Sequence, residues 1–391
     1  MEASPIKPAI KRAENIAKTV SAASRDIETA RELPPSLLTM LHDARLFRLL
    51  LPEELDGDEL DPVTLSKVTE IIAAQDASTA WCLGQGAGCA MAAAFLDPVI
   101  AKDVFGPSNA VLAWGAGIQG KATAVDGGYR VSGRWTFASG SRHATWLGAH
   151  SYIFEADGSP RMGANGRQIN RTALLQRDQA SIDDDWHVVG LRGTGSDSYT
   201  VKDLFVPEEY TLDRENKDEL RVTTNVYQLS TIQVFAAAFA GVMLGIARGM
   251  IDDVRALAMK KTPRGAASSL LDSQMFQAQF AELTARHGAA RSFLHETLNT
   301  TWEDIHGAKT LTLEQRAAIR LATTHAINQG VELTNEAYRL AGQNAIFQDA
   351  TFERRLRDAN AASQQVQARK SHYVTVGRVM LGLEPDAPMF L

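Results

Sequence analysis

The spacing of apolar residues along the chain changes twice. Up to about residue 108 apolar residues recur with the helical period, from 109 to about 212 they alternate as in β-strands, and after about 225 the helical period returns. We therefore predict an α+β protein made of an N-terminal α-helical domain over 1–108, a central β-barrel or sandwich domain over 109–225 and a C-terminal four-helix bundle over 226–391.

Prolines mark the expected helix starts in the first domain. A proline in the first turn of a helix loses no hydrogen bond, because the N–H groups of that turn have no partner within the helix. Such starts stand at Pro34-Pro35, Asp61-Pro62 and Asp97-Pro98. In the C-terminal domain, amphipathic segments separated by short Gly, Pro or Thr breaks predict four long antiparallel helices. They lie near 226–261, 270–306, 312–342 and 350–370.

The central domain contains an unusually aromatic stretch, "RWTFASGSRHATW" at 134–146. Turn signals at Asp126-Gly127 and Asp157-Gly158 delimit the neighbouring strands. We expect one strand to run on to residue 139, and its alternation then places Trp135, Phe137 and Ser139 on one face. Taken alone, such a strand is also typical of a β-sandwich core that ends in a polar turn.

Composition and charge narrow the class of protein. The chain has 391 residues, 45% of them hydrophobic and 22% charged, with a net charge of -6 and scattered Lys and Arg, so neither nucleic acid nor a membrane surface is an expected partner. Cys82 and Cys89 are expected on one helix, where a disulfide between them is excluded by geometry. The polar N-terminus does not read as a signal peptide, and the apolar run 234–247 is too short to span a bilayer. We expect a cytoplasmic protein.

Several common catalytic motifs are missing from the sequence. The nine histidines show no metal-ligand spacing, no G-x-S-x-G is present, and "GLRGTGSD" lacks the strand-to-helix context of a dinucleotide fingerprint. We therefore predict no metal site. The glycines of "GQGAGCA" at 84–90, with Gln85 and Gly88, fit either close helix packing or the wall of a substrate or flavin pocket.

Three blocks carry a resemblance to a known family. They are "SGRWTFASGSRHATW", "VVGLRGTGSDSYTVKDLFVPEEY" at 188–210 and "FERRLRDANAASQQ" at 352–365. In these blocks and in the order of its domains, the chain resembles the acyl-CoA dehydrogenase superfamily over essentially its whole length. "FASG" is most similar to the flavin-dependent monooxygenase branch. That resemblance implies reduced FAD or FMN supplied by a separate flavin reductase, a small-molecule substrate and a homotetramer.

The resemblance also assigns roles to individual residues. Ser139 and Ser141 would lie at the reactive edge of the flavin, with His143 and Trp146 just beyond, and Trp146 would line the substrate pocket with Gln85 and Gly88. Arginines 264, 354 and 357 could bind a flavin phosphate, since guanidinium binds phosphate with two parallel hydrogen bonds. The remaining expected cofactor contacts are Trp114, Trp135, Phe137, Gly195 and Ser196.

The sequence also departs from the family pattern after "RDA" at 357–359. No carboxylate follows until Glu384, so removal of an α-proton from an acyl thioester is disfavoured. Gln365 stands where the monooxygenases commonly have a histidine, and Gln cannot titrate, which leaves His143 or His372 as candidate proton shuttles. We expect a monooxygenase that uses a flavin hydroperoxide to oxygenate an aromatic or amine-bearing molecule. The alternatives are a dehydrogenase with a displaced base and a flavin-binding protein that has lost catalysis.

Overall fold

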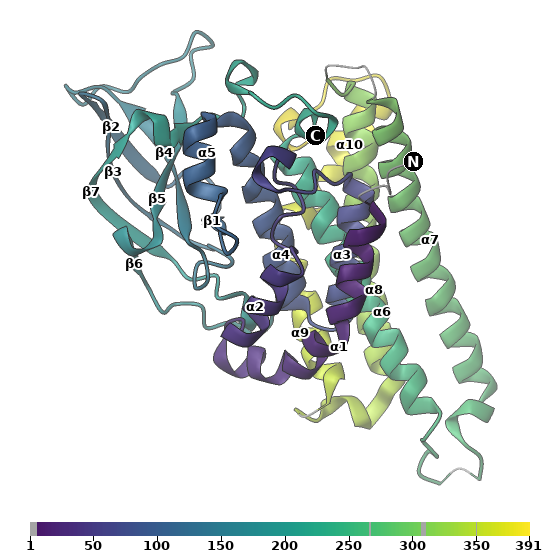
Figure 1. Ribbon diagram of the computed structural model, residues 1–391. Helices are drawn as coiled ribbons and strands as arrows, with labels where there is room; N and C mark the ends of the chain where they lie inside the picture. The colour runs from purple at the N-terminus through teal and green to yellow at the C-terminus, as the bar shows by residue number, and fades with distance from the viewer. Residues whose placement is uncertain (1–5, 266, 306–309, 349) are drawn as a thin grey trace.

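The computed structural model describes residues 6–265, 267–305, 310–348 and 350–391. A β-domain, a group of N-terminal helices and a bundle of long helices follow one another across Figure 1. The N-terminal helices are α1 (Ile6–Ala30), α2 (Pro35–Asp43), α3 (Pro62–Ala73), α4 (Ala77–Ala90) and α5 (Pro98–Phe105). The three proline starts are confirmed, because α2, α3 and α5 each begin at the proline.

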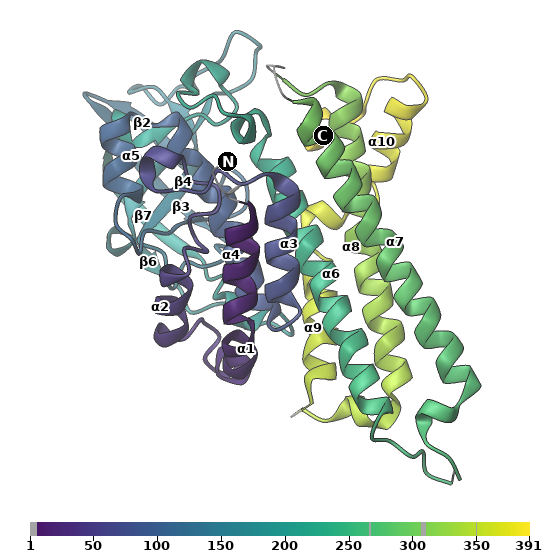
Figure 2. The same cartoon turned by 45° about the vertical axis from the view of Figure 1, so that its right-hand side comes forward.

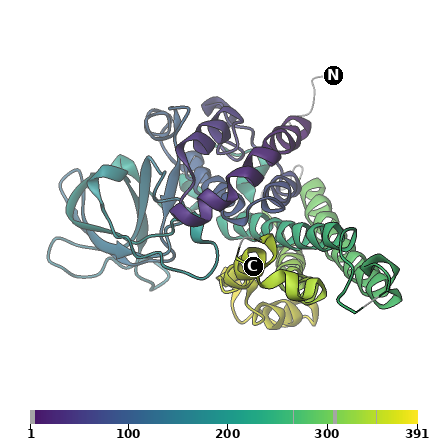
Figure 3. The ribbon, with the colours of Figure 1, turned by 90° about the horizontal axis from the view of Figure 1, so that it is seen from below.

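The β-domain is one mixed sheet. Its strands are β1 (Leu112–Trp114), β2 (Gly120–Val125), β3 (Gly128–Trp135), β4 (Trp146–Phe154), β5 (Asn170–Gln176), β6 (Ser181–Ile182), β7 (Tyr199–Pro207) and β8 (Thr211–Leu212). In the described residues they lie in the order β6-β7-β3-β2-β4-β5-β8, with β1 added beside β4. β4 pairs in parallel with β1 and β2, and the other pairs are antiparallel. Figure 3 shows this domain as a separate block to one side of the helices.

The predicted continuation of β3 to residue 139 is wrong. The strand ends at Trp135, and Phe137 takes a left-handed backbone conformation with φ +60, which lies outside the extended region of a regular strand. Phe137 is 63% exposed, whereas Trp135 and Ser139 are buried. The chain therefore turns away from the sheet at this point. The turn predicted at Asp126-Gly127 is confirmed, since Gly127 has φ +73 between β2 and β3.

The C-terminal helices are α6 (Thr231–Ala258), α7 (Gln274–Asp304), α8 (Leu313–Ala341), α9 (Thr351–Ala362) and α10 (His372–Met380). The single helix predicted over 350–370 is wrong: α9 ends at residue 362, and a short 3-10 turn precedes α10. Gln365 stabilises that turn, because its side chain accepts a hydrogen bond from the backbone N–H of Gln367 at 2.9 Å.

Helix α6 joins the helical domains into one body. It packs on α3, and Gly241 allows the close approach, since a Cβ there would lie 2.3 Å from the carbonyl oxygen of Ser66. Figure 2 shows α1 and α3 side by side between the β-domain and the bundle. By length and composition α6 is the one helix among the described residues that could span a membrane, but most of it is buried inside the protein. The expectation that 234–247 forms a buried helix is confirmed.

Candidate functional site

Helix α4 runs along the junction between the β-domain and α6. Its N-terminus is capped by Asp76, which accepts the backbone N–H of Thr79 at 2.7 Å. Trp81 donates its indole N–H to Ser139 Oγ at 3.1 Å and stacks on Phe239 of α6 with ring centroids 4.0 Å apart. Residues spaced by four share one face of a helix, so Gln85 and Cys89 continue the line that Trp81 begins.

The turn after β3 is fastened to the loop before β7. Gly140, with φ +83, donates its N–H to the Thr194 carbonyl at 2.9 Å, and Ala138 donates to the Asp197 carbonyl at 3.3 Å. Ser141 donates its hydroxyl to the Gly195 carbonyl at 3.0 Å and is fully buried. The two glycine- and serine-rich segments that the sequence singled out therefore form one rigid unit.

A chain of hydroxyl groups crosses this unit, and its direction follows from counting protons. Thr194 donates its hydroxyl proton to the Leu191 carbonyl at 2.9 Å, so the 2.6 Å contact between Thr194 and Ser196 uses the proton of Ser196. The 2.7 Å contact between Ser196 and Ser139 then uses the proton of Ser139, which accepts from Trp81. Ser139 has no proton left to donate, and one of its lone pairs remains free.

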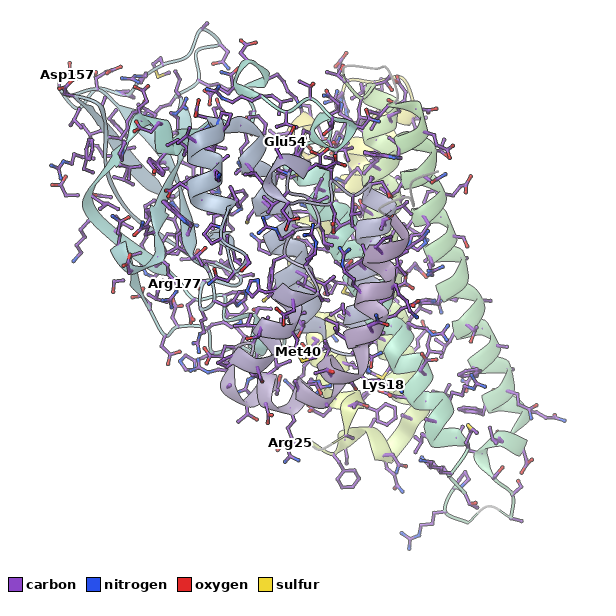
Figure 4. All side chains as sticks on the ribbon, in the orientation of Figure 1. Lys18, Arg25, Met40, Glu54, Asp157 and Arg177 are labelled. Carbon is purple, nitrogen blue, oxygen red and sulfur yellow. The ribbon has the colours of Figure 1, made fainter. Side chains whose placement is uncertain are left out.

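Two histidines beside the turn carry enclosed nitrogen atoms. His143 Nε2 and His42 Nδ1 have no solvent contact and no hydrogen-bond partner, and Phe47 packs against both rings, 5.5 Å and 4.9 Å between centroids. Burial lowers the pKa of His143 to about 3, and the charges of His42 and Arg177 act in the same direction. Figure 4 shows Arg177 at the edge of the β-domain, where its Nε donates to the Ser141 carbonyl at 2.7 Å. His143 is therefore neutral at neutral pH, with a nitrogen that can accept.

The predicted aromatic residues are not gathered in one place. Trp135 is fully buried in the β-domain, where it stacks on Tyr199 and donates to the His150 carbonyl at 2.9 Å. Phe137 points outward and meets the edge of Trp186. These placements give no support to a flavin wall made of Trp135 and Phe137.

Trp114 and Trp146 lie on the side of the β-domain that faces the helices. Trp114 is 4% exposed, and the guanidinium of Arg214 lies 4.4 Å from the centroid of its ring. Trp146 is partly buried and stacks on Tyr210 with centroids 5.6 Å apart. Both tryptophans pack into the large apolar core that includes α4 and α6.

The arginines predicted to bind phosphate are in different environments. Arg357 already donates to Glu353 at 2.6 Å and to Glu28 at 2.7 Å. Arg354 is partly buried, and its charge acts on the buried carboxyl groups of Asp76 and Asp358. Arg264 is exposed and lines a surface hollow with Lys260, Lys261, Gln343 and Asn344. Figure 1 shows the loop between α6 and α7 at the end of the bundle, away from the β-domain.

The segment after α9 carries another enclosed nitrogen atom without a partner, in this case a donor. The side-chain amide nitrogen of Gln365 has no solvent contact and no hydrogen-bond partner. His372, by contrast, is 2% exposed and its Nε2 is bonded to the Val366 carbonyl at 2.7 Å, so the ring is already committed. This geometry does not favour His372 as a proton shuttle.

Sequence reasoning missed several residues that build the junction: Trp81, Thr194, Arg214, Phe239 and Asp358. Asp358 is buried and accepts the backbone N–H of Leu191 at 2.7 Å, which attaches the 191–196 loop to α9. Burial raises its pKa to about 7. The Trp81 signal was present in the sequence, because Trp81, Gln85 and Cys89 follow a helix cap at spacings of four.

The junction fits a bound flavin in its chemistry. A flat ring with polar edges needs apolar stacking surfaces and unpaired hydrogen-bonding atoms around it. Trp81 and Phe239 supply the former, and Ser139, His143 and Gln365 each present a lone pair or a donor that no protein group uses. No group of three or more metal-binding side chains is found in the described part of the chain.

Comparisons with known proteins agree with this assignment. Residues 237–370 match the family described as acyl-CoA dehydrogenase, C-terminal domain. The chain is 28% identical over 340 residues to an indole-3-acetate monooxygenase of Pseudomonas putida, covering 87% of this chain and 85% of the relative. It is 26% identical over 387 residues to HsaA, the oxygenase subunit of a flavin-dependent monooxygenase of Mycobacterium tuberculosis, covering 96% of both.

The fold is shared with solved structures. The structure of XiaF from a Streptomyces species, in complex with FADH2 and glycerol, superposes with a TM-score of 0.89 at 22% identity, covering 97% of this chain and 96% of that chain. At this identity the likeness shows the fold alone. Residues 237–370 thus match the acyl-CoA dehydrogenase C-terminal domain, and the relatives that the chain resembles over most of its length are named as an indole-3-acetate monooxygenase and the oxygenase subunit of a flavin-dependent monooxygenase.

Proposed function

We propose that this protein is the oxygenase component of a two-component flavin-dependent monooxygenase that acts on an aromatic small molecule. When bound, reduced FAD or FMN supplies the electrons with which O2 is split, one oxygen atom entering the substrate and the other leaving as water. The named relatives support this proposal, since one is an indole-3-acetate monooxygenase and the other is the oxygenase subunit of a flavin-dependent monooxygenase; a separate flavin reductase is the partner that such a subunit requires.

One observation carries the proposal: Ser139 donates its only proton to Ser196, so toward a ligand it can act only as a hydrogen-bond acceptor. A lone pair without a proton matches the N–H that the central ring of a flavin carries only in its reduced state. The same lone pair repels the bare ring nitrogen of oxidised flavin. Ser139 thus favours the reduced cofactor, which an enzyme that captures reduced flavin from solution needs.

The other residues of the junction orient the ring and exclude water. Trp81 and Phe239 form a stacked aromatic wall from α4 and α6, and Ser196 fixes the Ser139 hydroxyl from the opposite side. His143 presents a neutral ring whose Nε2 can accept a hydrogen bond, and Gln365 presents an amide donor. Because Gln365 does not titrate and burial lowers the pKa of His143 to about 3, we assign both residues to orienting the ring by hydrogen bonds.

The dehydrogenase alternative lacks a base in this geometry. The carboxylate nearest along the chain after the third family block is Glu384, in an exposed segment after α10, and Asp358 points at the Leu191 N–H. A proton next to a thioester carbonyl needs a positioned base. The enclosed, unpaired nitrogens of His143 and Gln365 also argue against a protein that has lost catalysis, since unpaired buried polar groups are costly unless a ligand uses them.

The assembly and the location remain part of the proposal. The loop between α6 and α7, which carries Arg264, lies at the end of the bundle away from the β-domain, so any contact between this arginine and a flavin phosphate requires a second copy of the chain. We therefore propose a homotetramer, as the family resemblance implies, in the cytoplasm. Light scattering at micromolar concentration tests the assembly, and a stable monomer would remove Arg264 from the cofactor site.

The experiment that tests the function supplies a flavin reductase, NADH and ¹⁸O2 to the purified protein together with a panel of aromatic substrates. Mass spectrometry should find one labelled oxygen atom in a product, and the protein as purified should be nearly colourless. A tightly bound yellow flavin that acyl thioesters reduce without oxygen would support the dehydrogenase instead. Flavin binding with neither reaction would support a non-catalytic flavin-binding protein.

A further inference from the structure

Arg214 is a partly buried cation that forms no ion pair with any acid in the described part of the chain. Its guanidinium lies 4.4 Å from the Trp114 ring centroid, and the structure gives it no hydrogen bond or ion pair with any described residue. Arg320 shows the usual solution for a buried arginine, since it donates to the Gln367 side chain at 2.5 Å and to the Phe390 carbonyl at 2.6 Å. Burial lowers the pKa of Arg214, whereas Cys89, Glu215 and Asp213 act on it in the opposite direction.

The loop that carries Arg214 is held firmly in place. Arg171 donates to both carboxylate oxygens of Glu219 at 2.8 and 3.1 Å, and Glu219 in turn accepts the backbone N–H of Asp213 at 2.9 Å. The Asp213 carboxylate accepts the N–H of Glu215 at 3.0 Å, so the nearest acid along the chain is used by the loop itself. The unpaired guanidinium is therefore a fixed feature and its position needs no further ordering when a ligand binds.

One face of α4 runs from Trp81, which bonds Ser139, to Cys89, and Arg214 lies at the Cys89 end of this face. Its charge acts on the Cys89 thiol, and Cys89 follows Trp81 by eight residues on α4, a rise of roughly 12 Å along the helix axis. Between the two ends, a Cβ at Gly88 would collide with the Phe235 ring at 2.2 Å, and Phe235 stacks on Phe239 at 5.7 Å. This face is thus aromatic along its length and cationic at one end.

We infer that the substrate is an aromatic carboxylic acid, whose ring lies along α4 toward Ser139 and whose carboxylate binds Arg214. A guanidinium packed against an indole ring keeps N–H groups for other partners, and its planar fork matches the two coplanar oxygens of a carboxylate. The span from Trp81 to Cys89 suits a one- or two-ring acid with a short side chain. This assignment of substrate class rests on the proposed function and adds Arg214 as its specificity-determining residue.

The test compares acids with their neutral amides. Titration calorimetry under anaerobic conditions, on protein saturated with reduced FMN, would use indole-3-acetate against indole-3-acetamide and phenylacetate against phenylacetamide. The wild type should bind at least one acid about tenfold more tightly than its amide, as expected for hydrogen bonds to a buried charge. Wild-type protein that binds no acid of the panel more tightly than its amide overturns the inference, whatever the variants do.

Three variants locate the preference. Arg214→Gln removes the charge and should make acid and amide bind equally, whereas Arg214→Lys should keep part of the preference because it keeps the charge. The matched control is Arg221→Gln, an exposed arginine on the same connection, 55% exposed, which should change nothing. An acid preference that survives in Arg214→Gln overturns the assignment.

A second arm separates substrate from cofactor, because a flavin phosphate is the other anion available. If Arg214→Gln weakened reduced FMN but not reduced riboflavin, Arg214 would bind the cofactor phosphate and the inference would be wrong. Calorimetry needs no turnover, so acid preference without ¹⁸O incorporation would refute the proposed function while leaving the anion site. Oxygenation of neutral aromatics without any acid preference would do the reverse.

Discussion

Trp135 and Trp81 are both buried tryptophans, yet they belong to different kinds of environment. Trp135 is fully enclosed within one domain, stacks on Tyr199, and satisfies its indole N–H on a backbone carbonyl of the neighbouring strand β4. Trp81 is 8% exposed at the junction between the β-domain and α6, and its indole N–H bonds the Ser139 hydroxyl, which keeps one lone pair for a ligand.

The different hydrogen-bond partners of the two indole N–H groups distinguish a structural tryptophan from one placed to serve a binding site. A tryptophan whose polar atom is bonded to the backbone of its own sheet has nothing left to offer a ligand. A tryptophan that bonds a hydroxyl across a domain boundary joins a hydroxyl chain, here the one that runs from Trp81 through Ser139, Ser196 and Thr194 to the Leu191 carbonyl. Changes at the two positions should therefore have effects of different kinds.

The largest effect is expected for Trp135→Ala, on stability. Deleting a fully buried large aromatic side chain should lower the free energy of unfolding by about 3–5 kcal/mol, through lost burial and a cavity in the β-domain. Urea denaturation of variant and wild type measures this. Nearly unchanged stability combined with lost flavin binding would restore Trp135 as a wall of the cofactor site.

The next effect is a pH dependence from His143. Its pKa is about 3 in the folded chain against an ordinary 6.5, so below pH 6.5 the unfolded chain takes up a proton that the folded chain does not. Stability is therefore fully present above pH 6.5 and falls with decreasing pH, by at most about 1.4 kcal/mol per pH unit from this residue. Denaturation between pH 6.5 and 5 should show a shallower slope in His143→Gln than in the wild type, and equal slopes would contradict the assigned protonation state.

A smaller effect is expected for Ser139→Ala, on selectivity and coupling. Losing one hydrogen bond of about 0.5–1.5 kcal/mol should reduce the preference for reduced over oxidised FMN, and the product formed per reduced flavin consumed, by roughly 2- to 10-fold. Anaerobic titrations and a peroxide assay measure the two quantities. Ser141→Ala is the control, because Ser141 spends its proton on the Gly195 carbonyl and should alter stability only. If Ser141→Ala alone lowers coupling, the wrong serine has been assigned.

The smallest effect is expected for Trp81→Phe. Phenylalanine keeps a ring against Phe239 but cannot donate to Ser139, which still accepts from the reduced cofactor. The preference for reduced FMN should therefore change by no more than about twofold, less than in Ser139→Ala. A loss as large as that of Ser139→Ala would show that the indole N–H itself, rather than the Ser139 lone pair, determines the selectivity.

Much of the architecture could be predicted from the sequence because it depends on local rules. The period of apolar residues gave the order of helices and strands, proline at the first turn gave the starts of α2, α3 and α5, and glycine gave the turn between β2 and β3. The prediction failed at residues 137–139, where the backbone turns at Phe137 and Ala138 bonds the Asp197 carbonyl of a distant loop. It also failed at 363–371, where the Gln365 side chain bonds nearby backbone, and periodicity encodes neither contact.

The sequence by itself determined the three-part order of the chain, the buried character of α6 and the family blocks around Ser139 and 352–365. Only the tertiary structure decided which tryptophan meets Ser139, which way its hydroxyl proton points, and that Arg214 forms no ion pair with any residue that the structure describes. The physical reason is that a hydrogen bond depends on packing that brings two groups together, as it brings Trp81 to Ser139 across 58 residues of sequence. A charge stays unpaired when packing keeps its possible partners away, and no local sequence pattern records either outcome.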